Sequence, residues 1–129
     1  MKEYRNPADV HAPLAEYTHQ IEVRDPQRWL VLSGQVGRLP DGAVPEDAVA
    51  QLEIALENLA RNLHAAGMDP TDLVKLTFYI AGEMDAARRR DVLVGWLKDV
   101  RPCMTLLYVT ALASPIYKVE VDAWACRDE

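Results

Sequence analysis

Cysteine is scarce in this 129-residue sequence, which contains only Cys103 and Cys126. Two thiols are too few for a metal cage, and nothing about them suggests the disulfide framework of a small secreted domain. Long apolar runs are missing too: no window approaches the roughly 18–20 apolar residues that span a bilayer, and the N-terminus has no signal-peptide stretch. We therefore expect a cytoplasmic protein that does not associate with membranes.

Clustered positive charge is also missing. The formal net charge is −6, and the one basic run, Arg88-Arg89-Arg90, is followed at once by Asp91. A nucleic-acid surface neutralises phosphates with clustered Lys and Arg, so this acidic protein is not expected to bind nucleic acid. We expect Arg88 and Arg89 to lie on a solvated helix face.

The short motifs of common enzyme classes are absent as well. There is no glycine-rich phosphate loop, no G-x-S-x-G, no H-E-x-x-H and no C-x-x-C. None of the three histidines has metal-ligand spacing with a second ligand. His64 suits the end of a helix and His19 lies in a strand segment, whereas His11 falls in an irregular segment where it could line a pocket. No metal site is expected.

The sequence does contain enough apolar residues for one core. Half of its residues are hydrophobic, which fits a single domain over residues 1–129. The apolar pattern alternates between a period of two and a helical period. It predicts strand 17–23, strand 29–36, a helix from Pro45 to a Gly67 cap, strand 73–80, helix 85–98, strand 104–112 and strand 118–126. Strands and helices mixed in this way favour an α+β fold with the order β-β-α-β-α-β-β.

The apolar faces predict how the layers are arranged. The long helix carries a stripe with 3-4-3-4 spacing, which indicates packing on a sheet, although a coiled coil would show the same stripe: Val49, Leu52, Leu56, Leu59 and Leu63. Strand 104–112 is apolar on both sides, and two helices are expected to cover only one face of the sheet. We therefore expect a homo-oligomer in which a partner subunit covers the second face.

Two local anomalies point to a site. The triplet Ser33-Gly34-Gln35 interrupts an otherwise apolar strand, which indicates either a simple bulge or a place where a ligand approaches the backbone. Glu120 stands between Val119 and Val121 on the terminal strand. Its carboxylate either faces solvent or lies in a buried sheet, where it needs a partner and becomes a functional candidate.

The chain resembles the Rid (RidA/YjgF) family of imine and enamine deaminases from Asn6-Pro7 to Ala125. Each matching landmark is weak alone, but their order and spacing along the whole chain are specific. The landmarks are Tyr17, Ser33-Gly34-Gln35, Gln51, Ala55-Leu56, Asn58-Leu59, Ala66-Gly67, Asp72, Val74-Lys75, Thr77, Arg101-Pro102, Val119-Glu120-Val121 and Ala123.

The resemblance implies a chorismate-mutase-like fold that forms a homotrimer with ligand pockets between subunits. It also implies hydrolysis of enamines and imines such as 2-aminoacrylate to 2-oxo acids and ammonia, without a metal or organic cofactor. In such a site Glu120 would help position the attacking water, and an arginine would clamp the substrate carboxylate. Backbone groups around Ser33 and Gly34 would complete the pocket.

The chain departs from that pattern at the clamp. The family reads roughly P-x-R-[ST] where this chain reads Pro102-Cys103-Met104-Thr105, so Met104 stands in place of the arginine. Losing a bidentate clamp weakens carboxylate binding, which favours a less anionic or more apolar ligand than 2-aminoacrylate. Arg90 is a candidate ligand contact, Arg101 is expected to face solvent, and Cys103 is expected to be a small strand-end residue.

The expected function is a metal-free hydrolase with Glu120 as the catalytic residue and a binding set drawn from the matched positions: Tyr17, Ser33, Gly34, Arg90, Met104 and Thr105. The alternative is a non-catalytic trimer that binds a small molecule in the same pocket. Ribonuclease activity, ascribed to some members of the family, is disfavoured by the acidic charge. A chorismate-mutase-type isomerase would need arginines for a dicarboxylate that are lacking here.

Overall fold

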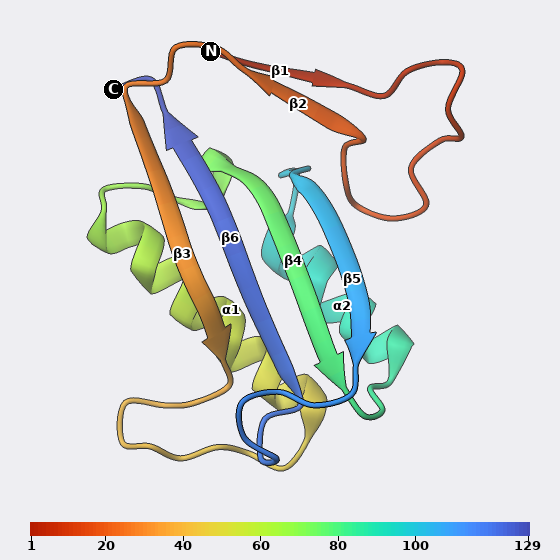
Figure 1. Ribbon diagram of the computed structural model, residues 1–129, viewed down its shortest axis with the longest axis vertical. Coiled ribbons are helices and arrows are strands. Elements are labelled where there is room, and N and C mark those ends of the chain that lie inside the picture. The colour runs from red at the N-terminus through yellow and green to blue at the C-terminus, as the bar shows by residue number, and fades with distance from the viewer.

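The computed structural model describes all residues, 1–129, and contains six strands and two α-helices (Figure 1). Their order is β1 (Lys2–Arg5), β2 (Gln20–Val23), β3 (Arg28–Val36), α1 (Ala48–Ala65), the short 3₁₀ helix η1 (Pro70–Asp72), β4 (Leu73–Ala81), α2 (Ala86–Leu97), β5 (Cys103–Val109) and β6 (Val119–Arg127). From β2 onward this is the predicted order.

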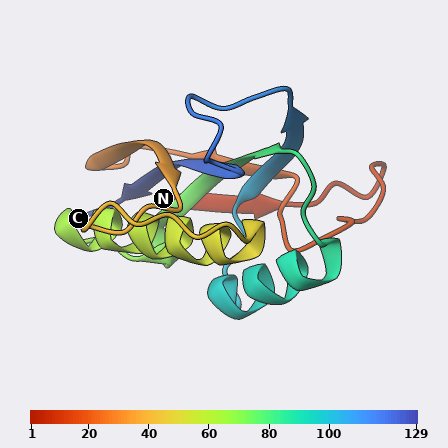
Figure 2. The same ribbon diagram turned by 90° about the horizontal axis from the view of Figure 1, so that it is seen from below.

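Four of the strands form one mixed sheet with the order β3-β6-β4-β5. β6 runs antiparallel to both of its neighbours, and β5 runs parallel to β4 at one edge. Both helices lie on the same side of this sheet (Figure 2). The predicted α+β class, with helices on one face of a mixed sheet, is confirmed.

The strand β1 has no counterpart in the sequence prediction. Its segment KEYR is mostly charged and lacks the alternation that marks a half-buried strand. It is ordered by pairing with β2, where Tyr4 lies opposite Ile21 and the Arg5 guanidinium contacts the Glu22 carboxylate at 2.7 Å. The predicted strand 17–23 is accordingly shorter and begins at Gln20.

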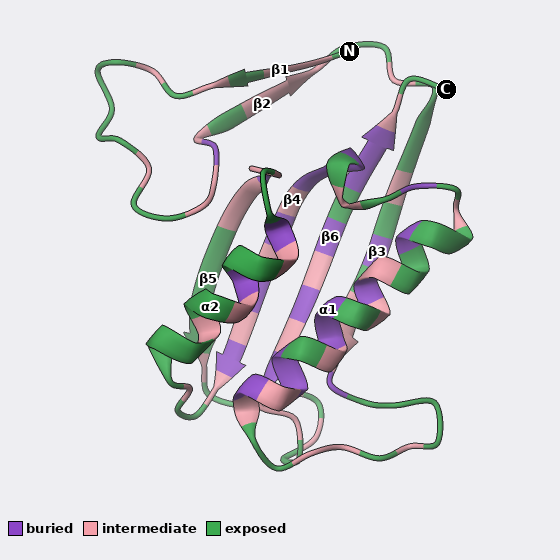
Figure 3. Cartoon of the chain, turned by 180° about the vertical axis from the view of Figure 1, so that it is seen from behind, coloured by how far each residue is buried: buried purple, intermediate pink, exposed green.

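The helix α1 packs its predicted stripe against the sheet. All five stripe residues are buried, and Figure 3 shows the buried segments that recur along α1. The helix begins later than predicted because Asp47 is its N-cap and accepts the Ala50 amide at 2.9 Å, which leaves Pro45 outside the first turn. Gly67 follows the last turn with φ +71°, so the predicted glycine cap is confirmed.

The core lies between α1 and the inner face of the sheet. The strand β6 alternates as predicted, with buried Val119, Val121, Ala123 and Ala125. β4 contributes a second inward set, and η1 leads directly into it: Leu73, Leu76, Phe78 and Ile80. The inner face is therefore closed by α1, and the site residues on β6 must lie on the opposite face.

The helix α2 covers the edge of the sheet less completely. Asp85 is its N-cap, and only Leu93 and Leu97 are fully buried. Trp96 and Val100 pack on the core from partly exposed positions, whereas Ala86 in the first turn is exposed. Ala86 lines a pocket beside α2 instead of the packed core.

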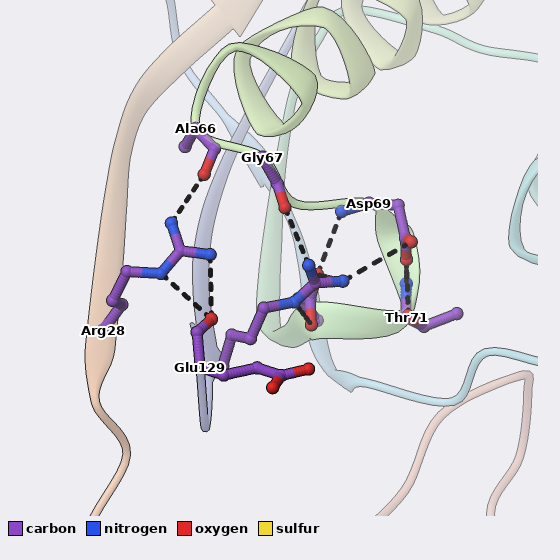
Figure 4. Close-up of polar contacts among 8 residues, drawn as sticks. Arg28, Ala66, Gly67, Asp69, Thr71 and Glu129 are labelled. Atoms are coloured by element: carbon purple, nitrogen blue, oxygen red, sulfur yellow. Dashed lines mark hydrogen bonds and ion pairs between the residues drawn. The ribbon is translucent and has the colours of Figure 1, made fainter.

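The C-terminal end of β6 is fastened to the turn after α1 (Figure 4). The Arg127 guanidinium donates to Asp72 Oδ1 at 3.1 Å and to the Gly67 carbonyl at 2.8 Å. The neighbouring Arg28 donates to the Ala66 carbonyl at 2.7 Å. Asp72 is almost fully buried, so Arg127 compensates its charge, and the two arginines together fix the edge where β3, β6 and η1 meet.

The face of the sheet opposite the helices carries large apolar groups without cover. Trp29 on β3 is 50% exposed and Trp124 on β6 is 47% exposed, and their rings meet edge to face with centroids 6.1 Å apart. We call this side the open face. Neither helix has the length and apolar content required to cross a membrane.

Candidate functional site

A pocket of about 340 Å³ lies beside α2 at the β5 edge of the sheet, and we call it the α2 pocket. Its volume falls in the range of small-molecule sites. Three parts of the chain line it: the segment before β2, one face of α2, and inward residues of β4 and β5. These residues are Leu14, Ala15, Glu16, Tyr17, Phe78, Ala86, Arg89, Arg90, Leu93, Met104 and Leu106.

The segment before β2 is held in place by its own polar contacts. The Leu14 amide donates to the Tyr17 hydroxyl at 3.1 Å, and the Tyr17 ring packs against His19 with centroids 5.5 Å apart. His19 Nε2 lies 2.7 Å from the carbonyl oxygen of His11. The histidines therefore shape this loop; His11, a sequence candidate for lining a pocket, does not line the α2 pocket.

Two arginines of α2 line the pocket. Arg90 pairs with Glu16 at 3.2 Å, and Arg89 donates to the Tyr108 hydroxyl at 3.0 Å. Arg89 is half-exposed where it lines the pocket, whereas Arg88 lies at the surface in a bidentate contact with Asp47. Ligand contact by Arg90 stays a prediction.

The floor of the pocket is apolar. Met104 and Leu106 alternate along β5 and lie opposite Leu76 and Phe78 of β4, so their side chains share the helix side of the sheet. Leu93 closes the floor from α2. At the position where the resemblance expects a guanidinium, the structure thus has a partly buried thioether packed on the core.

A second group of candidate residues lies on the open face. Pairing of β3 with β6 shifts register between Leu32 and Gln35, so a bulge is present at Ser33-Gly34, and the approach of a ligand to this backbone stays a prediction. A Cβ on Gly34 would lie 2.3 Å from Glu120 Oε2, which shows that the carboxylate lies directly against this backbone. Gln35 donates to the Ser33 carbonyl at 2.9 Å and stabilises the bulge.

The Glu120 carboxylate is half-buried and has no hydrogen bond or ion pair within the chain. Two residues along the strand, Asp122 instead accepts a hydrogen bond from the Tyr79 hydroxyl at 2.7 Å. That bond, with burial as a second cause, raises the pKa of the Tyr79 phenol. Glu120 is therefore free to bind water or a ligand, whereas Asp122 is occupied.

The remaining candidates lie outside both groups. Thr105 faces the open side, where its hydroxyl accepts from Lys75 Nζ at 2.7 Å. Arg101 donates to the carbonyls of Lys98 and Val100 at 2.7 and 2.9 Å, so it caps the end of α2 rather than facing solvent freely. Burial raises the pKa of the Cys103 thiol, which agrees with a structural strand-end residue.

The two groups cannot meet within one chain. The α2 pocket lies on the helix side at the β5 edge, whereas Ser33, Gly34 and Glu120 lie on the open face around β3 and β6. The sequence analysis predicted site residues that belong to both groups, but it did not predict that the two groups lie on opposite faces of the sheet. No group of three or more His, Cys, Asp or Glu side chains could hold a metal ion.

Relatives of known name match most of the chain. It is 32% identical to the protein DfrA of Myxococcus xanthus over 114 residues, covering 87% of this chain and 86% of that protein. It is 30% identical to a mouse protein named 2-iminobutanoate/2-iminopropanoate deaminase over 118 residues, covering 90% and 84% of the two chains.

A solved structure has the same fold over almost the whole length. The conserved Rid-family protein YyfB of Yersinia pestis superposes with a TM-score of 0.85 at 26% identity, covering 97% of this chain and 98% of that one. The family model described as Endoribonuclease L-PSP matches residues 8–127. The chain therefore belongs to the Rid (RidA/YjgF) family, which that model describes, and some of its relatives are named imine deaminases.

Proposed function

We propose that the protein is a Rid-type hydrolase that deaminates an enamine or imine metabolite other than 2-aminoacrylate. The observation that carries the proposal is the Glu120 carboxylate, which is half-buried, has no partner within the chain and lies against the glycine bulge at Gly34. A carboxylate held in this way can orient and deprotonate water.

The reaction needs only water and a substrate. Glu120 takes a proton from water as the hydroxyl oxygen bonds to the imine carbon, and the proton passes to the imine nitrogen. Collapse of the resulting carbinolamine breaks the carbon–nitrogen bond, releases ammonia and leaves the carbonyl product. Backbone groups of the Ser33-Gly34 bulge lie where they can position the substrate.

The proposal places the site between subunits of a homotrimer. The α2 pocket and the Glu120 group lie on opposite faces of one sheet, so only a second copy can bring them together. The open face, with Trp29 and Trp124, offers the apolar surface that such contact would cover. Tyr17, Arg90 and Met104 would then come from one subunit, and Ser33, Gly34 and Glu120 from its neighbour.

Met104 supports a substrate other than 2-aminoacrylate. A thioether cannot form the bidentate contact with a carboxylate that a guanidinium forms. Met104 instead packs against the core and lines the α2 pocket with an apolar group. For Thr105 we propose a structural role. Its hydroxyl accepts a hydrogen bond from Lys75 and therefore stabilises the strand pair rather than binding the substrate.

The test is release of ammonia and 2-oxo acid from imines generated in situ by an amino-acid oxidase or a serine dehydratase. We expect activity on a bulkier imine that falls at least a hundredfold in Glu120→Ala, because general-base catalysis contributes about that much. Asp122→Asn, on the same strand face, is the matched control and should retain activity. Met104→Arg should raise activity on 2-iminopropionate.

The alternative is a non-catalytic binding protein of the same fold, and Met104 is the observation that favours it. If the protein and Met104→Arg both fail to accelerate hydrolysis of any imine tested, the hydrolase proposal is wrong and binding alone remains. Equal activity in Glu120→Ala and the parent protein would also contradict it.

A further inference from the structure

The α2 pocket carries a positive charge that the chain does not neutralise, in a molecule whose formal net charge is −6. Its charged lining residues are Glu16, Arg89 and Arg90. Glu16 pairs with Arg90 at 3.2 Å, so two guanidinium groups and one carboxylate leave a charge of +1. Arg89 forms no ion pair and donates only to the neutral Tyr108 hydroxyl. The uncompensated charge therefore lies on Arg89.

The rest of the pocket is apolar and fits the non-polar part of a small ligand. Phe78, Leu93, Met104 and Leu106 form its floor. Leu93 follows Arg89 by one helical turn, which puts the guanidinium and the apolar floor on the same face of α2. A pocket with an unpaired guanidinium and an apolar floor is complementary to an organic acid with a bulky non-polar substituent.

We propose that the Arg89 guanidinium binds the ligand carboxylate in this protein. The α2 pocket then selects 2-imino acids with a branched or aromatic side chain, together with their 2-oxo acid products. This inference rests on the proposed function, which it deepens by naming the substrate class. Arg89 on α2 supplies the positive charge that the family has at the position of Met104 on β5. The Met104 side chain itself forms part of the apolar floor. Arg90 is a second donor, restrained by Glu16.

The inference is tested by binding, which needs no hydrolysis. Calorimetric titration of the full-length protein uses three probes: 4-methyl-2-oxopentanoate, its methyl ester and pyruvate. We expect the branched acid to bind at least tenfold more tightly than pyruvate, because each methylene that enters the apolar floor strengthens binding severalfold. It should also bind at least tenfold more tightly than the uncharged ester, because only the acid can accept the charged hydrogen bonds of Arg89.

Two variants assign the charge to named residues. Arg89→Gln should weaken binding of 4-methyl-2-oxopentanoate about tenfold, whereas Arg88→Gln, the same change on the same helix outside the pocket, should leave the affinity unchanged. Glu16→Gln should strengthen binding severalfold, because it frees Arg90 and makes the pocket more positive. If Arg89 had only a structural role, Arg89→Gln would not weaken binding while Glu16→Gln strengthens it.

The inference is overturned if the ester binds as tightly as the acid, if no probe binds, or if Arg89→Gln behaves like Arg88→Gln. These results leave the hydrolase proposal standing, since that proposal depends on turnover and on Glu120. Conversely, Glu120→Ala could hydrolyse imines as fast as the parent protein while the branched acid still binds in an Arg89-dependent way. That result would contradict the hydrolase proposal and support the role of Arg89 in binding.

Discussion

At the scale of single residues, Gly34 and Glu120 depend on each other. The sequence marked each as an anomaly, one as a break in a strand and the other as a charge between valines. It could not show that they touch, because the contact depends on the register between β3 and β6, which shifts at the bulge itself. The backbone of Gly34 lies so close to the Glu120 carboxylate that no other residue fits without moving it.

This contact predicts the effect of Gly34→Ala. The added methyl group would lie 2.3 Å from Glu120 Oε2, so the carboxylate must turn away from the bulge. We expect imine hydrolysis to fall at least tenfold, whereas the free energy of unfolding in urea should change by less than about 1 kcal/mol, because the half-exposed side chain of Glu120 can turn toward solvent. Gly95→Ala is the control, because nothing lies within 4 Å of its new Cβ. Full activity in Gly34→Ala would show that the contact has no catalytic role.

For Arg88 and Arg89, the sequence does not determine which of the two side chains faces the pocket. Neighbouring residues on a helix point about 100° apart, so one can pair with another helix while the next faces a pocket. Which one does so depends on how α2 sits on the sheet edge. α2 has only two fully buried side chains, Leu93 and Leu97, and its apolar pattern is too weak to fix that rotation from sequence alone.

At the scale of elements, predictability follows the strength of the apolar pattern. α1 and β6 were predicted well because each presents an unbroken apolar face to one core. β1 was not, because its order depends on pairing and on the ion pairs of Arg5 rather than on burial. The N-terminal end of α1 is set by the capping side chain of Asp47, whereas the sequence pattern placed the start of the helix at Pro45.

Asp47 also joins the two helices, and this predicts a pH dependence. The hydrogen bonds from the Arg88 guanidinium, and then from the Ala50 amide, lower the pKa of the Asp47 carboxyl in the folded protein. The folded state therefore binds fewer protons there than the unfolded state. The stabilisation is present above the unfolded pKa of about 4 and is lost as the pH falls through the lower folded pKa.

The variant Asp47→Asn isolates this effect, because asparagine keeps the N-cap but not the charge. We expect its melting temperature to lie modestly below that of the parent at pH 7, and the gap to close as the pH falls below the unfolded pKa of about 4 and through the lower folded pKa. Asp9→Asn, an exposed carboxyl without a partner, is the control. A gap that stays constant over this range would mean that the Arg88 contact contributes nothing.

At the scale of the whole molecule, the proposed site would be assembled from two half-sites that one chain keeps apart. Under the proposed function, the α2 pocket supplies the binding groups and Glu120, which lies against the Gly34 bulge, supplies the general base. The sequence predicted that a partner would cover the open face, since strand 104–112 is apolar on both sides. It could not predict that the half-sites lie on opposite faces, because that follows from the strand order β3-β6-β4-β5.

Assembly is therefore expected to be required for activity, and Trp124 offers the test. We expect the parent protein to sediment at about three times the 14.5 kDa mass of one chain. Trp124→Lys places a charge in the centre of the open face, where its desolvation on assembly is costly, so this variant should sediment as a monomer. Its hydrolysis should be lost although Glu120 and Arg89 are unchanged.

The control for this experiment is Val94→Lys, which adds the same charge at an exposed apolar position on α2, away from the open face. It should remain a trimer with full activity. A monomeric parent protein, or a monomeric Trp124→Lys that still hydrolyses imines, would contradict the shared site. In that case Glu120 would have to act without the α2 pocket, because the two lie on opposite faces of the sheet of one chain.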